Sequence, residues 1–300
     1  MINKKISAII TTYNRPSSIV NRALLSIINQ TYKVYEILIV DDNPFENDSD
    51  KELNEISKEI KQLVSSYENV NYIKNPNGNS GANFARNIGI LNCHGEFLAF
   101  LDDDDEWLPQ KIEKQLDVFN NSNVNDIGMV FSSGLVRKYN GKNIIEEDYY
   151  TYKNFAFYPK FSDLLREDVI GSTSQPLIKR KVFEEIGLFD IFMPARQDYD
   201  MWLRISKKYN VVGIKEKLFI HYHHSMGQIS KKKINSYLGY NLLYYKYYKE
   251  YNNDIIAWLN IHCYIYYNQK GFIGSINSFL IRVLRKIILL LISLKVIIIK

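Results

Sequence analysis

The sequence GEFLAFLDDDDEW, residues 95–107, joins a run of apolar residues directly to four consecutive aspartates. Its apolar part, residues 96–101, has the length and continuous hydrophobicity of a strand buried on both faces of a parallel sheet. Adjacent carboxylates are costly, because two unit charges about 4 Å apart interact by around 4 kcal/mol at an effective dielectric of 20. They must protonate, reach water or hold a cation. This stretch therefore predicts a buried strand that ends in a charged site.

Two earlier apolar runs, residues 6–12 and 36–40, and the segment 70–74 are expected to be strands of the same sheet. Each is followed by a segment that is expected to be helical. Alternating strands and helices predict an α/β fold, a doubly wound, mostly parallel sheet with right-handed crossovers and helices on both faces. Further strands are expected at residues 128–132, 175–179 and 210–213, and helices near 181–186 and 198–208.

Polar residues follow three of the expected strands directly. They are residues 11–14, Asp41 with Asp42, and the aspartates at 102–105. Ligands of open α/β sheets bind beyond the carboxyl ends of the strands. We therefore expect these three clusters to meet at one edge of the sheet.

Composition indicates a folded protein of the reducing cytosol. Hydrophobic residues make up 46% of the 300 residues and charged residues 24%, which excludes a disordered chain. Two cysteines, Cys93 and Cys263, exclude a disulfide framework and a zinc ribbon. Residues 1–10 lack the apolar core and cleavage site of a signal peptide.

Charge divides the chain unevenly. Residues 228–300 contain eleven Lys and Arg against two acidic residues, so their net charge is +9. Because the whole chain has a net charge of +5, residues 1–227 have a net charge of −4. We expect one domain over residues 1–227. A basic, Tyr-rich helical C-terminal region is expected over 228–300.

The end of the chain, FLIRVLRKIILLLISLKVIIIK (residues 279–300), predicts a basic amphipathic helix. Its longest uncharged run is eight residues, residues 287–294, well short of the ~20 that span a bilayer. Such a helix fits an anionic membrane interface, although it could instead pack on the catalytic domain. We expect peripheral membrane contact.

The aspartates at 102–105 are expected to bind Mn²⁺ or Mg²⁺. Ions of this kind prefer oxygen ligands and complete their shells with substrate phosphates. A solvated acidic loop is the alternative. An EF-hand is excluded because Trp107 occupies the position that requires glycine. The P-loop and dinucleotide-binding glycine motifs are absent.

Six segments of the chain together resemble family 2 glycosyltransferases, the inverting GT-A enzymes that use nucleotide-sugar donors. They occur in the family's order and span about two-thirds of the chain. The resemblance implies that residues 1–227 are the catalytic domain, with a nucleotide-sugar half at about 1–110 and an acceptor half at about 111–227. The segments are ISAIITTYNRP (6–16), SIINQTYKVYEILIVDDNP (26–44), NSGANFARNIGI (79–90), GEFLAFLDDDDEWLPQKI (95–112), PLIKRKVFEEIGLFD (176–190) and QDYDMWLRI (197–205).

The resemblance implies a nucleotide-binding set. Thr11 and Tyr13 would line the nucleobase pocket, and Asp42 would accept from the uracil N3–H with Asp41 beside it. Arg86 would lie near the nucleotide or brace the acids. The ribose and nucleotide contacts would then come from Asp102 and Asp103.

The resemblance also implies a metal site and a general base. Asp104, the last member of the DxD motif, would bind the ion together with Asp102. Asp198 stands where the family places the base that takes the acceptor hydroxyl's proton, which inversion by direct displacement requires. The departing nucleoside diphosphate needs a cation beside it.

The chain departs from the family's pattern at two places. Gln197 precedes Asp198 where the family has Glu, and Asp200 is a rival base for which we expect a structural role. The sequence HYHH, residues 221–224, stands where the family often has Arg or His, and His224 is our candidate for a diphosphate or metal contact. Trp107 and Trp202 are expected to be core or wall residues.

The sequence therefore predicts a metal-dependent hexosyltransferase acting on a UDP-sugar or another nucleoside diphosphate sugar. The acceptor would be a hydroxyl of a glycan or lipid-linked glycan in cell-surface polysaccharide biosynthesis. We expect a cytoplasmic protein at the inner face of the cytoplasmic membrane, with no nucleic-acid partner. The alternatives are a non-catalytic nucleotide-sugar or metal-binding module, and a nucleotidyltransferase.

Overall fold

The structure is a computed structural model, and it describes residues 4–44, 51–140, 143–150, 156–223 and 233–268, with residues 283 and 286. The candidate His224 and nearly all of the expected amphipathic helix at 279–300 lie outside these residues. The chain divides into two compact units. The first contains residues 1–160, 169–191 and 204–224, and the second contains residues 161–168, 192–203 and 225–300.

Four parallel strands form the N-terminal part of the first unit's sheet. They are β1 (Ile6–Thr12), β2 (Glu36–Asp41), β3 (Val70–Lys74) and β4 (Phe97–Asp102), in the order β3-β2-β1-β4. Thr11 pairs with Asp102 on one side, and Thr12 pairs with Asp41 on the other. The polar strand ends therefore meet at one edge of the sheet, as the sequence predicted.

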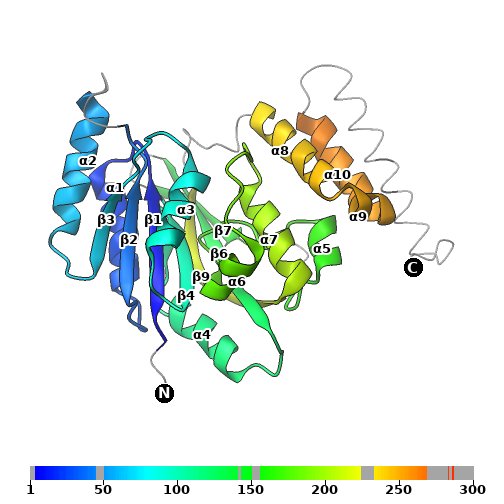
Figure 1. Ribbon diagram of the computed structural model, residues 1–300, viewed down its shortest axis with the longest axis horizontal. Coiled ribbons are helices and arrows are strands. Elements are labelled where there is room, and N and C mark those ends of the chain that lie inside the picture. The colour runs from blue at the N-terminus through cyan, green and yellow to red at the C-terminus, as the bar shows by residue number, and fades with distance from the viewer. Residues whose placement is uncertain are drawn as a thin grey trace. The chain divides into compact units, whose positions relative to one another are not determined.

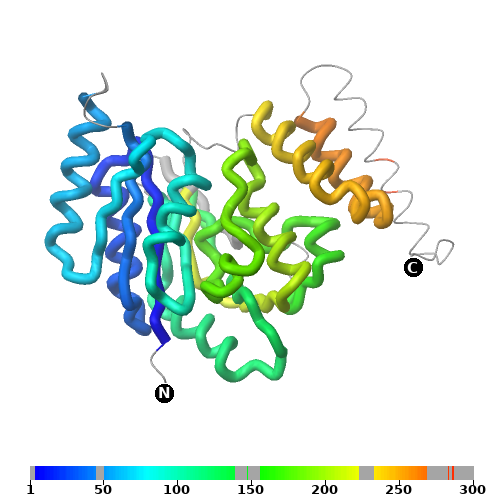
Figure 2. The backbone as a smooth tube through the Cα atoms, in the orientation of Figure 1, coloured from blue at the N-terminus to red at the C-terminus, as the bar shows by residue number. Residues whose placement is uncertain are grey.

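Helices cover both faces of these four strands (Figure 1). Apolar residues of α1 (Ser17–Ile28), α2 (Lys51–Val64) and α4 (Lys111–Asn121) share one core with Ile6, Ala8 and Ile10 of β1. On the other face, α3 (Ala82–Asn92) packs on β1 and β2. A Cβ added at Gly89 of α3 would lie 2.5 Å from Cγ2 of Ile9, so this helix approaches the strand closely. The tube in Figure 2 follows the chain back to the sheet after each of these four helices.

The remaining strands of the first unit mix parallel and antiparallel pairs. They are β5 (Glu106–Trp107), β6 (Ile127–Asn140), β7 (Asn143–Tyr150), β8 (Leu177–Lys179) and β9 (Asn210–His223). The sheet continues from β4 through β8, β6 and β9 to β5, and β7 pairs with β6. Among these pairs only β6 and β9 are parallel. The short helix α6 (Arg180–Ile186) follows β8.

The second unit is helical. It contains α5 (Phe161–Arg166), α8 (Lys233–Lys246), α9 (Tyr248–Asn253), α10 (Ile255–Asn268) and the first part of α7 (Gln197–Lys208). Arg166 pairs with Asp254 at 2.7 Å, and the rings of Tyr240 and Tyr264 stack with centroids 4.8 Å apart. The expected Tyr-rich helices are therefore present. No helix among the described residues is long and apolar enough to cross a membrane.

Candidate functional site

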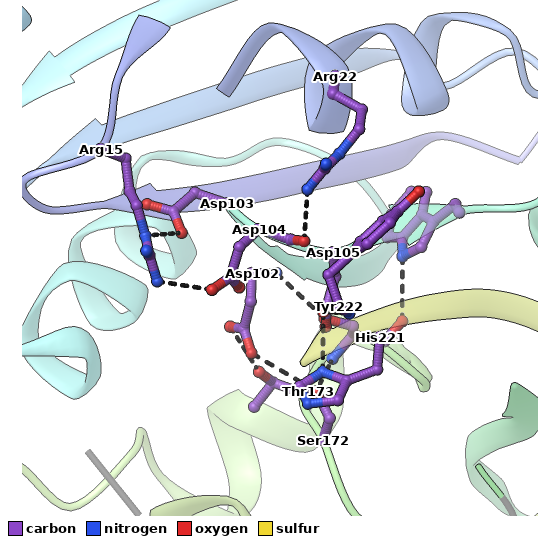
Figure 3. A network of polar contacts seen from close by, with 12 residues as sticks. Arg15, Arg22, Asp102, Asp103, Asp104, Asp105, Ser172, Thr173, His221 and Tyr222 are labelled. Carbon is purple, nitrogen blue, oxygen red and sulfur yellow. Dashed lines mark hydrogen bonds and ion pairs between the residues drawn. The ribbon is translucent and has the colours of Figure 1, made fainter. Parts of the chain in front are cut away.

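The aspartates at 102–105 form a turn at the carboxyl end of β4, which we call the aspartate turn. The amide of Asp105 donates to the carbonyl of Asp102 at 2.9 Å and closes the turn. Asp102 and Asp105 contact separate partners, whereas Asp103 and Asp104 share one guanidinium. Figure 3 shows Arg15 and Arg22 approaching the turn from one side and His221 and Thr173 from the other. The charge that the sequence concentrates here is therefore separated and neutralised by several elements.

Asp102 is the most accessible member of the turn, with 32% of its side chain exposed. Its Oδ1 accepts from Arg86 Nη2 at 2.8 Å and from Thr173 Oγ1 at 3.1 Å. Burial would raise the pKa of Asp102, but the charge and hydrogen bonds of these neighbours hold it below its ordinary value. Asp102 is thus an ionised carboxylate at the strand edge. Arg86, on α3, braces it.

Asp103 and Asp104 share a single guanidinium. Arg15 Nε lies 3.2 Å from Asp103 Oδ1, and Arg15 Nη2 lies 2.6 Å from Asp104 Oδ2. Burial and the neighbouring charge of Asp104 raise the pKa of Asp103 to about 7, although Arg15 opposes the rise. Arg22, on α1, donates to the backbone carbonyl of Asp104 at 2.8 Å. Arg15 and Arg22 thus hold the middle of the turn from the β1–α1 side.

Asp105 fixes the turn to the second half of the sheet. Its buried carboxylate accepts from Ser174 Oγ at 2.6 Å and lies 2.9 Å from His221 Nδ1 on β9. Burial opposes a charge on His221, but the hydrogen bond and charge of Asp105 raise its pKa to about 9. His221 is therefore protonated at neutral pH. Of the HYHH sequence, this histidine joins the aspartate turn.

Asp41 and Asp42 are buried and already hydrogen-bonded. Asp41 accepts from the Tyr72 hydroxyl at 2.6 Å and from Lys74 at 3.1 Å. The carboxylate of Asp42 accepts from the amides of Ser80 and Gly81 at 3.0 and 2.8 Å, and also from the side-chain amide of Asn75. Asp42 thus ties the loop 75–81 to the end of β2.

The loop after β1 carries the two expected base-pocket residues. Thr11 is half-buried at the end of β1, and Tyr13 is 41% exposed just beyond it. An exposed aromatic ring beside a polar strand edge provides a face on which a planar base could stack. Thr11 and Tyr13 therefore lie on the same sheet edge as the aspartate turn.

Asp198 belongs to the second unit. It is half-buried in the first turn of α7, and its Oδ1 accepts from the amide of Tyr199 at 2.8 Å. Asp200 is wholly buried, and its carboxylate accepts from Tyr247 and pairs with Lys246 at 2.6 Å. Asp200 therefore has the structural role that the sequence predicted. The two tryptophans, Trp107 and Trp202, are core residues with at most 1% exposure.

Sequence reasoning missed Arg15, Arg22 and the hydroxyl residues at 172–174. A signal existed for Arg15, since it follows the first strand within TTYNRP and four acids need counter-charges. Ser172, Thr173 and Ser174 precede β8, and their hydroxyls reach Asp102 and Asp105. No local sequence pattern predicts these hydrogen bonds to the aspartates, because they depend on the antiparallel pairing of β8 with β4.

A complete protein-made metal site is not present in the described part of the chain. Within it, no three His, Cys, Asp or Glu side chains are grouped as ligands. A divalent ion that keeps waters and substrate phosphates needs only one or two carboxylates. Asp102, which is partly exposed, offers one such carboxylate, and the carboxylate of Asp104 is paired with Arg15 in this structure.

Comparison with known proteins identifies the family. Residues 7–187 match the model of Glycosyl transferase family 2, which is more than half of the chain. The chain belongs to glycosyl transferase family 2. An uncharacterized glycosyltransferase of Methanocaldococcus jannaschii is 29% identical over 262 residues, covering 84% of this chain and 83% of the relative. Three longer relatives from Rickettsia are matched over only 27 to 31% of their length.

Two further family 2 comparisons come from proteins with more informative names. The Escherichia coli enzyme UDP-Glc:alpha-D-GlcNAc-diphosphoundecaprenol beta-1,3-glucosyltransferase WfgD is 27% identical over 209 residues, covering 70% of this chain and 72% of WfgD. The structure of S. aureus TarS 1-349 in complex with UDP-GlcNAc aligns with a TM-score of 0.57 at 13% identity, covering 88% of this chain and 81% of TarS 1-349. That likeness confirms the expected GT-A α/β fold.

Proposed function

We propose that this family 2 glycosyltransferase is an inverting hexosyltransferase that uses a UDP-sugar or another nucleoside diphosphate sugar. The observation that carries the proposal is the aspartate turn, which lies at the carboxyl edge of the parallel strands with Arg86 against Asp102. Ligands of open α/β sheets bind at that edge. The names of WfgD and of the TarS complex, which mention UDP-Glc and UDP-GlcNAc, support a UDP-linked donor.

The nucleoside would lie over the ends of β1 and β2. Tyr13 and Thr11 would line the base, and Asp42 would accept from the uracil imide while Asp41 holds the end of β2 in place. The ribose would approach Asp102, whose pKa is kept low by Arg86 and Thr173 despite burial. An ionised carboxylate is the acceptor that a ribose hydroxyl needs. Asp103 completes this nucleotide-binding set in our proposal.

The departing diphosphate would lie beside the aspartate turn. Asp104 and Asp102 would hold Mn²⁺ or Mg²⁺ there, because their carboxylate oxygens are the ligands that these ions prefer. The bound ion would supply positive charge where the leaving nucleoside diphosphate becomes more negative. A contact from His224 is part of the proposal, although that residue lies outside the described chain.

We propose Asp198 as the general base of the inverting reaction. Direct displacement at the anomeric carbon requires a base that takes the proton of the attacking hydroxyl on the face opposite the leaving group. Asp198 is half-buried and has a backbone amide on Oδ1. That hydrogen bond orients the carboxylate.

We further propose that the acceptor is a glycan or a lipid-linked glycan of cell-surface polysaccharide biosynthesis. WfgD, by its name, acts on a diphosphoundecaprenol acceptor. The excess of basic residues in 228–300 would favour the anionic inner face of the cytoplasmic membrane. Vesicle co-sedimentation with and without residues 279–300 tests this contact.

Donor consumption tests the proposed reaction. Purified protein is incubated with labelled UDP-sugars, Mn²⁺ and lipid-linked acceptors, and the released nucleotide is identified. We expect UDP release that Asp104→Ala abolishes, and Asp198→Asn should bind donor without transfer. Release of pyrophosphate would instead indicate a nucleotidyltransferase, and binding of UDP-sugar without turnover would indicate a binding module. Full activity of Asp198→Asn would refute the base assignment.

A further inference from the structure

The backbone around Arg15 is fixed by contacts of the neighbouring residues, whereas the Arg15 side chain is partly exposed. The preceding residue, Asn14, has a φ of 49°, and its amide donates to Asn43 Oδ1 at 2.7 Å. The following residue, Pro16, is the N-cap of α1. The Arg15 side chain remains 25% exposed. The position of Arg15 is therefore fixed at the sheet edge, while its guanidinium can change partners by rotation of its side chain.

The guanidinium of Arg15 contacts two carboxylates that the proposed function assigns to other ligands, Asp104 to the divalent ion and Asp103 to the nucleotide. It contacts Asp103 Oδ1 at 3.2 Å and Asp104 Oδ2 at 2.6 Å. Among the described residues, Arg15 is the one ion-pair partner of the Asp104 carboxylate. The other arginines at the turn have different contacts. Arg86 pairs with Asp102, and Arg22 donates to the backbone carbonyl of Asp104 and lies over the ring of Tyr222.

We propose that Arg15 is an exchangeable counter-cation of the aspartate turn. In the free enzyme it neutralises Asp103 and Asp104, and when donor binds it moves to the diphosphate while a divalent ion takes its place on the turn. This inference rests on the proposed function. The exchange follows from electrostatics, because a guanidinium and a divalent ion in contact with the same carboxylate repel each other. The diphosphate brings the negative charge that lets both cations remain in the site.

The exchange makes donor and metal binding cooperative. An ion that binds alone must displace Arg15 into water, and a diphosphate that binds alone meets two carboxylates with no added cation. Each ligand therefore binds weakly without the other. Linkage requires the coupling to be reciprocal, so UDP strengthens Mn²⁺ binding by the same factor as Mn²⁺ strengthens UDP binding.

Replacement of Arg15 by glutamine separates this role from a structural one. Mn²⁺ affinity is measured by electron paramagnetic resonance of the free ion, with and without UDP, and UDP affinity by titration calorimetry. We expect Arg15→Gln to bind Mn²⁺ without UDP on the order of tenfold more tightly than wild type, within the usual range of coupling between sites. Its UDP-dependent enhancement should be smaller, and its UDP affinity in saturating Mn²⁺ weaker.

Arg22→Gln is the matched control. It removes a guanidinium from the same turn but releases no carboxylate oxygen, so its Mn²⁺ affinity without UDP should change much less. Arg15→Lys, which keeps the charge, should retain weak Mn²⁺ binding and enhancement by UDP.

The outcomes are distinguishable. Equal or weaker Mn²⁺ binding by Arg15→Gln, or an unchanged enhancement by UDP, would overturn the exchange while leaving the proposed function intact. If wild type binds neither UDP nor Mn²⁺, the proposed function fails, and the exchange fails with it. Thermal unfolding of each variant checks that it is folded. If Arg15→Gln does not fold, Arg15→Met is measured in its place with the same expected and contrary results.

Discussion

The buried amine of Lys111 tests how strongly the protein interior disfavours a charge. Lys111 is the first residue of α4 and has no exposed surface. Its Nζ donates to Gln115 Oε1 at 2.8 Å and lies 4.4 Å from the centroid of the Trp107 ring. Burial lowers the pKa of Lys111 well below its ordinary value. The folded protein therefore favours the neutral amine at this position more than the unfolded chain does.

The sign and size of the effect follow from proton linkage. At a pH between the folded and unfolded pKa values, the unfolded chain binds one more proton, so stability rises with pH by about 1.4 kcal/mol per pH unit. Lys111→Met removes this dependence and keeps a long apolar side chain in the core. We expect the stability of the variant relative to wild type to fall by about 1.4 kcal/mol for each pH unit that lies between the folded and unfolded pKa values of Lys111.

Urea unfolding followed by tryptophan fluorescence at several pH values measures this relative stability. Lys114→Met is the control, because Lys114 lies on the same helix, is partly exposed and pairs with Glu216. The control should keep the pH slope of wild type. A Lys111→Met protein that is less stable than wild type by an amount independent of pH would show that the amine is charged and paired, and would refute the reasoning.

Two further predictions concern buried ionic contacts of the first unit. Burial would raise the pKa of Glu36, but hydrogen bonds from Ser7 and His94 lower it. The ionised Glu36 therefore stabilises the folded protein above about pH 4.3, and this contribution is lost as pH falls through the pKa of Glu36 in the folded state. Glu36→Gln should cost about 1–3 kcal/mol at pH 7 and much less at pH 3, measured by urea unfolding. The pKa of His221 is raised to about 9, so its contribution is complete below about pH 6.5 and is lost as pH rises to 9, a loss of about 3 kcal/mol. His221→Asn should lack that loss between pH 6.5 and 9; an equal alkaline loss in wild type and variant would contradict the ion pair with Asp105.

The N-terminal half could be predicted closely because β1, β2 and β4 are largely apolar runs followed by polar clusters. The observed β1 and β3 coincide with the predicted segments, and β2 and β4 extend into Asp41 and Asp102. Strands that are buried on both faces are recognisable in a sequence because nearly all of their residues are apolar. The motif residues at their ends therefore appear where the sequence places them.

The second half was harder to predict because its strands carry polar residues. The predicted segment 128–132 is the start of β6, which continues to Asn140, and 210–213 is the start of β9, which continues to His223. Their outer parts mix polar and apolar residues without a clear period, and they pair with each other and with β7 or β5. Helix α4 and strand β7 were missed altogether. Periodicity alone could not reveal these pairings, which are set by partners distant in sequence.

The aspartate turn shows the same limit for the candidate site. The sequence identified four carboxylates and an arginine, Arg86, but not the pairing of Arg15 with Asp103 and Asp104. It also could not show that residues 161–168 and 192–203 group with the C-terminal helices. Both facts depend on which segments meet in space. Composition and motif spacing do not carry that information.

Anomalous diffraction from crystals soaked with UDP and Mn²⁺ tests the central claim most directly. The account predicts a manganese peak between the diphosphate and the carboxylates of Asp102 and Asp104, with the uracil beside Tyr13 and Asp42 and with Arg15 turned from the aspartates to the diphosphate. A nucleotide bound away from the carboxyl edge of β1 and β4, or an aspartate turn that keeps Arg15 and holds no manganese, would contradict it.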